Sequence, residues 1–131
     1  PGSPGVQDRL HMIWTYGVEK GKISRTKFVD VCCTTPAKIC GIYPQKGEIA
    51  VGSDADIVIF DPNYKGVFSN ETSLHDTDYN AYEGFEQIGR AEKVFLRGSL
   101  VAENGKFLGT EGQGQQVMAK PYGLCYDGFK E

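Results

Sequence analysis

The fold is decided by TTPAKICGIYPQKGEIAVGSDADIVIFD, residues 34–61, in which a helical pattern gives way to a strand pattern. Thr35-Pro36 is typical of a helix boundary, because proline ends a helix that precedes it and fits the first turn of one that follows. We therefore expect one helix to stop here and a short one to begin. Ala37 and Ile39 should face inward on the short helix, and Gly41 should close it.

The second half of this stretch predicts a strand. Residues 57–60, IVIF, are an unbroken β-branched and aromatic run between a Gly-Ser-Asp turn at 52–54 and Asp61-Pro62. Such a run is typical of a strand that is buried on both faces. We expect Asp61-Pro62 to end it, since proline cannot donate a hydrogen bond to a neighbouring strand.

Upstream of this stretch the sequence predicts two further helices. Ser3 and Pro4 form a start signal for the first, with serine as N-cap and proline at the first helical position. Ser24 can cap the second. The residues expected to face inward follow a helical repeat: Val6, Leu10, Ile13, Trp14, Tyr16 and Val18 on the first helix, and Phe28, Val29, Val31 and Cys32 on the second.

Downstream the pattern predicts an extended loop, hairpins and an arm. Residues 63–91 are polar and aromatic with little periodicity, and we expect a loop with short strands. Residues 94–102 read as a hairpin, and Asn104-Gly105 is the strongest turn signal in the chain. Residues 109–131 are expected to form an arm that packs on another surface, because the stretch ends in apolar side chains at Tyr122, Leu124, Tyr126 and Phe129.

Composition excludes several classes of function. The 131 residues are 40% hydrophobic and 24% charged, with a net charge of −3 and no basic block, which disfavours nucleic acid as a partner. No apolar run approaches the roughly 20 residues of a membrane helix. The first five residues, PGSPG, do not resemble a signal peptide. We therefore expect a soluble, cytoplasmic protein.

The four cysteines predict free thiols. Cys32, Cys33, Cys40 and Cys125 include no Cys-x-x-Cys pair, so their spacing matches no zinc template. Buried or half-buried thiols in a reducing compartment are the main interpretation. A disulfide from Cys125 to one of the others is the alternative.

No catalytic or metal-ligating set can be assembled from the residue pattern. A hydrolytic zinc site needs about three protein ligands, and the chain has only His11 and His75. His11 lies beside the apolar stripe and is interpreted as a half-buried polar residue. His75 with Asp76 and Asp78 could bind a cation weakly, but a surface loop is the preferred interpretation.

Two further patterns are interpreted as structural. Asp54 and Asp56 fall on one face of an extended segment. If both carboxylates were buried there, the repulsion between their charges would raise the pKa of one of them. Their position at a turn favours hydrogen bonds to nearby backbone amides instead. Gly112-x-Gly114 is followed by no helix pattern and is not a phosphate loop.

Four segments carry a resemblance to a known family. Residues 34–61 are similar to a stretch of the amidohydrolase superfamily that dihydroorotases, allantoinases, hydantoinases and related deacetylases share. Residues 78–98, with DYNAYEGF, Gly89-Arg90 and VFLRG, resemble dihydropyrimidinases and hydantoinases. Pro4–Leu10 and Lys120–Tyr122 resemble a helix and the tail of the same enzymes. The resemblance covers essentially the whole chain.

The resemblance implies an α/β fold and a place for the chain within it. It implies that residues 1–44 are the last helices of a (β/α)₈ metal-dependent hydrolase barrel. Residues 45–108 would be the C-terminal strands of a composite β-sandwich, and residues 109–131 a C-terminal arm. The family's dimers and tetramers imply a homo-oligomer.

The resemblance also implies a chemistry that this piece does not carry out alone. The parent protein would open dihydropyrimidine or hydantoin rings with two divalent metals, usually zinc, whose hydroxide attacks the amide carbon. All the metal ligands would lie upstream of Pro1, so we expect no catalytic or metal residue here. The weak candidates for substrate binding are Pro1 and Gly2, through the backbone of a loop. Alternatives are a non-enzymatic oligomeric scaffold like the collapsin-response mediators, an allantoinase or a dihydroorotase.

Overall fold

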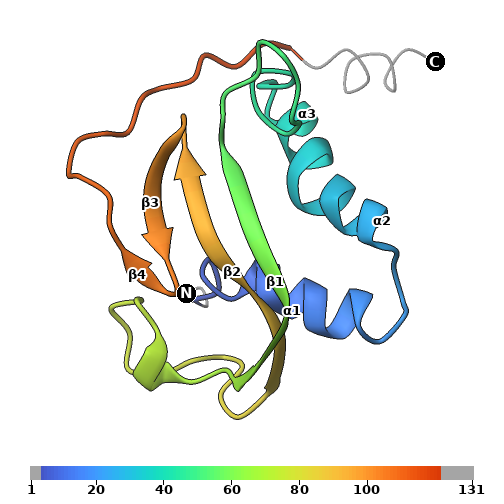
Figure 1. Cartoon of the computed structure of the whole chain (residues 1–131), viewed down its shortest axis with the longest axis vertical. Helices are drawn as coiled ribbons and strands as arrows, with labels where there is room; N and C mark the ends of the chain where they lie inside the picture. Colours follow the sequence, from blue (N-terminus) through green and yellow to red (C-terminus); the bar gives the residue numbers. More distant parts are fainter. Residues whose placement is uncertain (1–3, 122–131) are drawn as a thin grey trace. The chain divides into compact units, whose positions relative to one another are not determined.

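The computed structural model describes residues 4–121 (Figure 1). The chain divides into two compact units, one of Pro1–Phe28 with Phe60–Ala91 and one of Val29–Ile59 with Glu92–Glu131. The elements are, in chain order, α1 Arg9–Ile13, η1 Trp14–Val18, α2 Arg25–Val29, η2 Asp30–Thr34, α3 Thr35–Ile39, β1 Ile57–Val67, η3 Asn70–Thr72, β2 Glu86–Leu96, β3 Ser99–Glu103 and β4 Lys106–Phe107.

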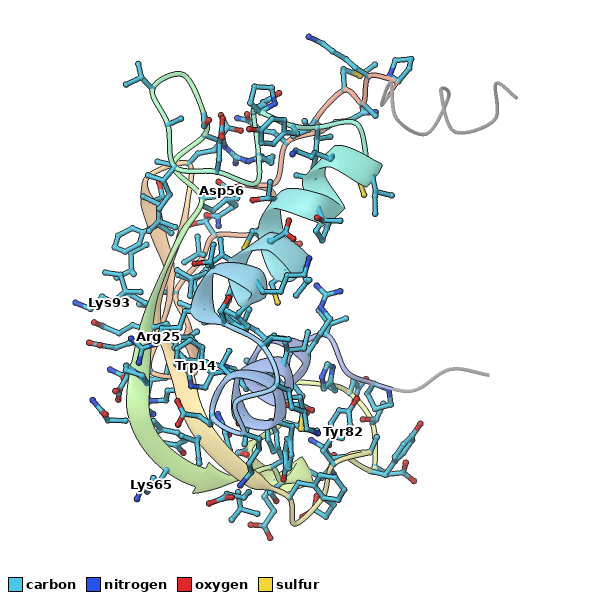
Figure 2. The ribbon with its side chains drawn as sticks, turned by 90° about the vertical axis from the view of Figure 1, so that its right-hand side faces the viewer. Trp14, Arg25, Asp56, Lys65, Tyr82 and Lys93 are labelled. Atoms are coloured by element: carbon cyan, nitrogen blue, oxygen red, sulfur yellow. The ribbon has the colours of Figure 1, made fainter. Side chains whose placement is uncertain are left out.

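In the first unit, Trp14 of the predicted apolar stripe is the centre of an aromatic cluster. This side chain is 6% exposed, and its ring centre lies 5.2 Å from that of Phe28 and 4.6 Å from that of Phe60. The guanidinium of Arg25 covers the indole at 5.7 Å from the ring centre, and Figure 2 labels both residues. The prediction is wrong for Val6, which is exposed because it precedes the first helical turn.

Within the same unit, the side chain of Thr15 connects η1 to the backbone of β2. Thr15 is fully buried, and its hydroxyl oxygen accepts a hydrogen bond from the amide of Ile88 at 3.0 Å. The hydroxyl also lies within hydrogen-bonding distance of the carbonyls of His11 and Ile88. A buried hydroxyl needs such partners, because losing water without replacing its hydrogen bonds is costly.

The helical backbone continues through Thr35-Pro36, which corrects the predicted boundary. Ser24 caps the second helix as expected, since its Oγ accepts from the amide of Lys27 at 3.0 Å. The π-helical turn η2 then leads directly into α3, with helical dihedral angles at Thr34 and Thr35. The wide π turn accommodates Pro36, which lacks the N–H that an ordinary turn would use.

Burial along these helices confirms some predictions and contradicts others. Phe28 and Ala37 are buried as predicted, and Gly41 ends α3 with a positive φ of 68°. Val29, Val31 and Ile39 were predicted to face inward but are exposed. The described part of the chain provides no layer that covers them.

The strands form one four-stranded sheet with the order β1-β2-β3-β4. The predicted hairpin is confirmed in the second unit, where β2 and β3 pair antiparallel and Leu96 lies opposite Ser99. Arg97 and Gly98 form its turn, with φ of 48° and 80°. The turn at Asn104-Gly105 is also confirmed, since it joins β3 to β4 with φ of 50° and 80°. Two consecutive positive φ angles match the twist of such tight hairpins.

Strand β1 corrects the sequence prediction twice. It continues through Asp61-Pro62 to Val67, which is possible because β1 is an edge strand of the described sheet. Its start is not buried on both faces, since Val58 and Ile59 are 46% and 45% exposed. The expected loop at 63–91 is correspondingly shorter, because β1 and β2 extend into it and η3 lies between them.

The segment after β4 runs without regular structure as far as Pro121. The amide of Lys120 donates to the carbonyl of Gly41 at 2.7 Å, and the guanidinium of Arg97 donates to the carbonyl of Gln113. Predictions made for Pro1, Gly2 and Ser3, and for the arm beyond Pro121 including Cys125, lie outside the described residues. Across residues 4–121, no helix has the length and apolar character to span a bilayer.

Candidate functional site

The most buried acidic side chain of the first unit lies at the start of α1. Asp8 is 5% exposed, and its Oδ2 accepts a hydrogen bond from Nδ2 of Asn80 at 3.0 Å. Asn80 is 9% exposed, and its Oδ1 accepts from the amide of Tyr82 at 2.8 Å. The pair joins two segments that lie 72 residues apart in the sequence, and both segments were singled out by the sequence patterns above.

Gln7 makes a second connection between the same two segments. Its Oε1 accepts from the amide of Leu74 at 2.7 Å, and its Nε2 donates to the carbonyl of Thr72 at 3.4 Å. The side-chain amide thus pairs with the backbone on both sides of Ser73. Gln7, Asp8 and Asn80 are called the N-terminal clamp below. Sequence reasoning missed it, because nothing local to Asp8 indicates a partner so far away.

His11 is half-buried, as the sequence suggested, and is engaged in the fold. Its Nε2 accepts a hydrogen bond from the amide of Ala91 at 3.1 Å. Burial lowers the pKa of His11 below its usual value, and the nearby carboxylate of Asp8 only partly opposes this. A neutral imidazole that already accepts a backbone N–H has no lone pair left at Nε2 for a metal.

His75 is not brought together with its neighbouring aspartates into a metal site. Its amide donates to Oγ of Ser73 at 3.2 Å, and its Nε2 is buried without a hydrogen-bond partner. Between residues 4 and 121, no group of three or more His, Cys, Asp or Glu side chains could hold a metal ion. The described part of the chain therefore offers no metal centre.

Asp54 and Asp56 have a structural role, but the prediction that they bond to nearby backbone amides is wrong, because their partners are the side chains of Lys46 and Gln45 and the distant amide of Arg97. Oδ1 of Asp56 accepts from the amide of Arg97 at 2.9 Å, and both carboxylates contact the ammonium group of Lys46, with Asp54 at 2.8 Å. The hydrogen bond from Lys46, followed by that from Gln45, lowers the pKa of Asp54. Burial acts to lower the pKa of Lys46, but the two aspartates outweigh it and the pKa is raised. Sequence reasoning did not identify Lys46.

Cys32, Cys33 and Cys40 are not disulfide-bonded. Cys32 is half-buried, whereas Cys33 and Cys40 are exposed. Burial around the sulfur raises the pKa of the Cys33 thiol, which disfavours the reactive thiolate. The substrate-loop candidates Pro1 and Gly2 are outside the described residues, so their contact with a substrate stays a prediction.

Comparison with known proteins places these features in a family. The family model described as "Amidohydrolase family" matches residues 6–101. The chain is 43% identical over 122 residues to D-hydantoinase of Geobacillus stearothermophilus, covering 93% of this chain and 26% of that protein. It is 46% identical over 116 residues to dihydropyrimidinase 1 of Caenorhabditis briggsae, covering 88% and 24%.

A solved structure supports the same relationship. A crystal structure of D-hydantoinase superposes with a TM-score of 0.89 at 44% identity, covering 92% of this chain and 26% of that one. The chain therefore has the fold of the corresponding part of a hydantoinase. It spans about a quarter of the length of the relatives it matches.

Proposed function

This chain belongs to the amidohydrolase family, and we propose on that premise that it is the C-terminal part of a hydrolase that opens cyclic amides. The substrates proposed for the whole protein are dihydropyrimidine or hydantoin rings. The observation that carries the proposal is the sequence identity to proteins named D-hydantoinase and dihydropyrimidinase over most of this chain. The isolated chain is proposed to be inactive.

The proposed reaction adds one water to a ring C–N bond. The carbonyl carbon gains the hydroxyl of the water and the ring nitrogen takes up its proton as the C–N bond breaks. The resulting carboxylic acid then releases a proton to solvent and becomes a carboxylate. In the whole protein two divalent metals, proposed to be zinc, would make hydroxide available near neutral pH by lowering the pKa of a bound water. The described residues do not fit such a centre, because they bring no three ligands together and His11 is engaged by Ala91. No step is therefore assigned to a side chain between Pro4 and Pro121.

The proposed place of the chain in the whole protein follows the order of its elements. Residues 1–44 are proposed as the last helices of a (β/α)₈ barrel, and residues 45–108 as the C-terminal part of a β-sandwich. The helices up to Ile39 and the strands from Ile57 to Phe107 support this division. The exposed apolar residues Val58 and Ile59 support a covering layer contributed by the rest of the protein.

Substrate contact is proposed for the backbone of Pro1 and Gly2 only. Proline has no N–H, so Pro1 would offer its carbonyl oxygen as an acceptor for a ring N–H.

A homo-oligomer in the cytoplasm is proposed, with residues 109–131 as an arm between subunits. Deleting residues 119–131 from the complete protein should reduce the number of subunits in the oligomer, measured as its mass in solution. An unchanged number of subunits would count against the proposed role of the arm.

The activity is tested on the complete protein loaded with zinc or manganese. We expect turnover of dihydrouracil or of a 5-substituted hydantoin, followed as loss of the ring absorbance and appearance of the ring-opened acid. Metal content is measured on the same sample. If metal is bound and neither ring is opened, the proposed activity is wrong.

Native mass spectrometry of the 131-residue chain in the presence of zinc tests the proposed inactivity of the isolated piece. We expect no stoichiometric zinc and no turnover. One or two tightly bound zinc ions per chain would contradict the assignment of the metal ligands to other parts of the protein. The same spectrum gives the number of copies that associate.

A further inference from the structure

Two side chains of the first helical segment bind the backbone of β2 within the first unit. Nε2 of His11 in α1 accepts from the amide of Ala91 at 3.1 Å, and the hydroxyl of Thr15 in η1 accepts from the amide of Ile88 at 3.0 Å. Both bonds join a side chain to a backbone N–H, and the two side chains lie one helical turn apart. They differ because an imidazole takes up a proton near neutral pH, whereas a threonine hydroxyl does not titrate in that range.

The hydrogen bonds of His11 select one neutral tautomer of the imidazole. Nε2 accepts from Ala91, so it carries no proton in this structure. The ring also makes a hydrogen bond with the backbone of Gln7, one turn earlier. The proton of the neutral ring therefore lies on Nδ1, where the carbonyl oxygen of Gln7 accepts it. A second proton can be added only at Nε2, which faces an N–H donor.

The surroundings of the imidazole oppose a positive charge, with one exception. The ring of Phe60 in β1 stacks on the imidazole, with 6.3 Å between the ring centres and 29° between the ring planes. Asp8 is the charged group that favours the protonated form. Its carboxylate already accepts from Asn80 in the N-terminal clamp. Burial has the larger effect, so the pKa of His11 is lowered and the fold favours the neutral ring.

Three further charged side chains flank the strand residues that contact His11, namely Asp61 in β1 and Arg90 and Glu92 in β2. The guanidinium of Arg90 lies over the ring of Tyr64, 4.4 Å from its centre. Oδ1 of Asp61 accepts from the amide of Asn63 at 2.9 Å. Asp61 and Arg90 are thus engaged by other groups of their own strands, and Asp8 is the acidic partner of the imidazole.

We propose that the hydrogen bond between His11 and Ala91 is a proton-sensitive latch that releases α1 from β2 in mild acid, while Thr15 still holds η1 on the same strand. Protonation places an N–H on Nε2 opposite the amide N–H of Ala91, so repulsion between two donors replaces the hydrogen bond. The imidazolium is then attracted to Asp8, which lies three residues earlier on the same side of the helix. The opening is local, because the contact at Thr15 does not depend on pH. This inference does not rest on the proposed function.

Hydrogen–deuterium exchange of the complete protein, resolved to single amides, tests the latch. Protection factors, corrected for the intrinsic pH dependence of exchange, are compared at pH 7.5 and pH 5. We expect the protection of the Ala91 amide to fall on the order of tenfold, because the open state takes up a proton more readily than the closed state. The protection of the Ile88 amide should change by less than about twofold over the same range. Ile88 is thus an internal reference in the same molecule.

Two variants identify the titrating group. His11→Gln retains a polar side chain but removes the titration, so the protection of Ala91 should no longer depend on pH, whatever its level. Val6→Ala is the matched control, because it changes an exposed side chain near the same helix that does not titrate. It should keep the wild-type fall in protection at Ala91.

Each outcome supports or overturns the latch. Equal protection of Ala91 at both pH values overturns it. An equal loss at Ile88 also overturns it, because the whole unit then opens in acid. If His11→Gln shows the same fall at Ala91 as the wild type, another group titrates and the inference is wrong. The comparison of Ala91 with Ile88 needs only the wild-type protein, so it remains valid if His11→Gln does not fold. Ring-opening activity is measured separately and does not affect this result.

Discussion

Gly89 lies against Trp14 so closely that no side chain fits between them. A β-carbon built on Gly89 would be 2.8 Å from Cδ1 and 2.9 Å from Nε1 of the indole, and 2.6 Å from Phe60. Gly89 also has a positive φ of 75° within β2. Both features require glycine, and together they allow η1 to pack on the strand. The packing of this core therefore requires glycine at position 89.

Gly89→Ala should strongly destabilise the protein. We expect a loss of about 2–4 kcal/mol, because the methyl group overpacks the core and a non-glycine residue must adopt a positive φ. Thermal melting of the complete protein is the measurement. Gly98→Ala is the matched control, since Gly98 has a φ of 80° but open space around its β-carbon. It should cost only about 1 kcal/mol, and equal effects of the two changes would contradict the packing argument.

Replacing Lys46 should change how stability responds to acid. The lowered pKa of Asp54 means that this carboxylate stabilises the fold above its unfolded pKa, and that the contribution disappears as pH falls through the lower, folded pKa. The raised pKa of Lys46 retains the ammonium until strongly alkaline pH. Lys46→Met should therefore lower the melting temperature at pH 7 and flatten its fall between about pH 5 and pH 2. The exposed Lys106→Met is the control, and an identical acid profile for both variants would refute the proposed role of Lys46.

Protonation of His11 should destabilise the fold. Burial lowers its folded pKa below the usual value of 6.5, so the unfolded chain binds more protons just below that pH. The contribution of neutral His11 to the free energy of unfolding is therefore fully present above pH 6.5. It declines as the pH falls toward the folded pKa. We expect His11→Gln to be less stable at pH 7.5, where the acceptor for Ala91 is disturbed, but to lose less between pH 7 and pH 5. Val6→Ala, which changes an exposed side chain that does not titrate, is the control, and it should retain the wild-type decline in melting experiments.

Gly41→Ala should release the part of the predicted C-terminal arm that lies around Lys120. A β-carbon at Gly41 would be 1.8 Å from the carbonyl oxygen of Lys120, whose amide donates to the carbonyl of Gly41. The substitution also forces a positive φ of 68° on alanine. We expect faster proteolysis around Lys120 in the complete protein. Gly21→Ala, with a φ of 67° and open space, is the control. Equal cleavage rates for the two variants would mean that Gly41 does not anchor this segment.

The sequence alone determined the features that depend on neighbouring residues. The turns at Arg97-Gly98 and Asn104-Gly105, the cap at Ser24 and the end of α3 at Gly41 all follow from local dihedral preferences and short hydrogen bonds. The family was also recognisable from sequence, because residues 34–61 and 78–98 carry its patterns. Trp14 was placed correctly in the core, since a helical repeat fixes the face that a side chain occupies.

Only the tertiary structure decided which distant groups meet. Asp8 could not be paired with Asn80 from sequence, because a contact 72 residues away leaves no periodic signal. The passage of β1 through Pro62 depends on β1 being an edge strand of the described sheet. The exposure of Val58 depends on whether another layer covers that face of the sheet. Local propensity specifies the backbone conformation of a segment, whereas burial and pairing are properties of what the rest of the chain places beside it.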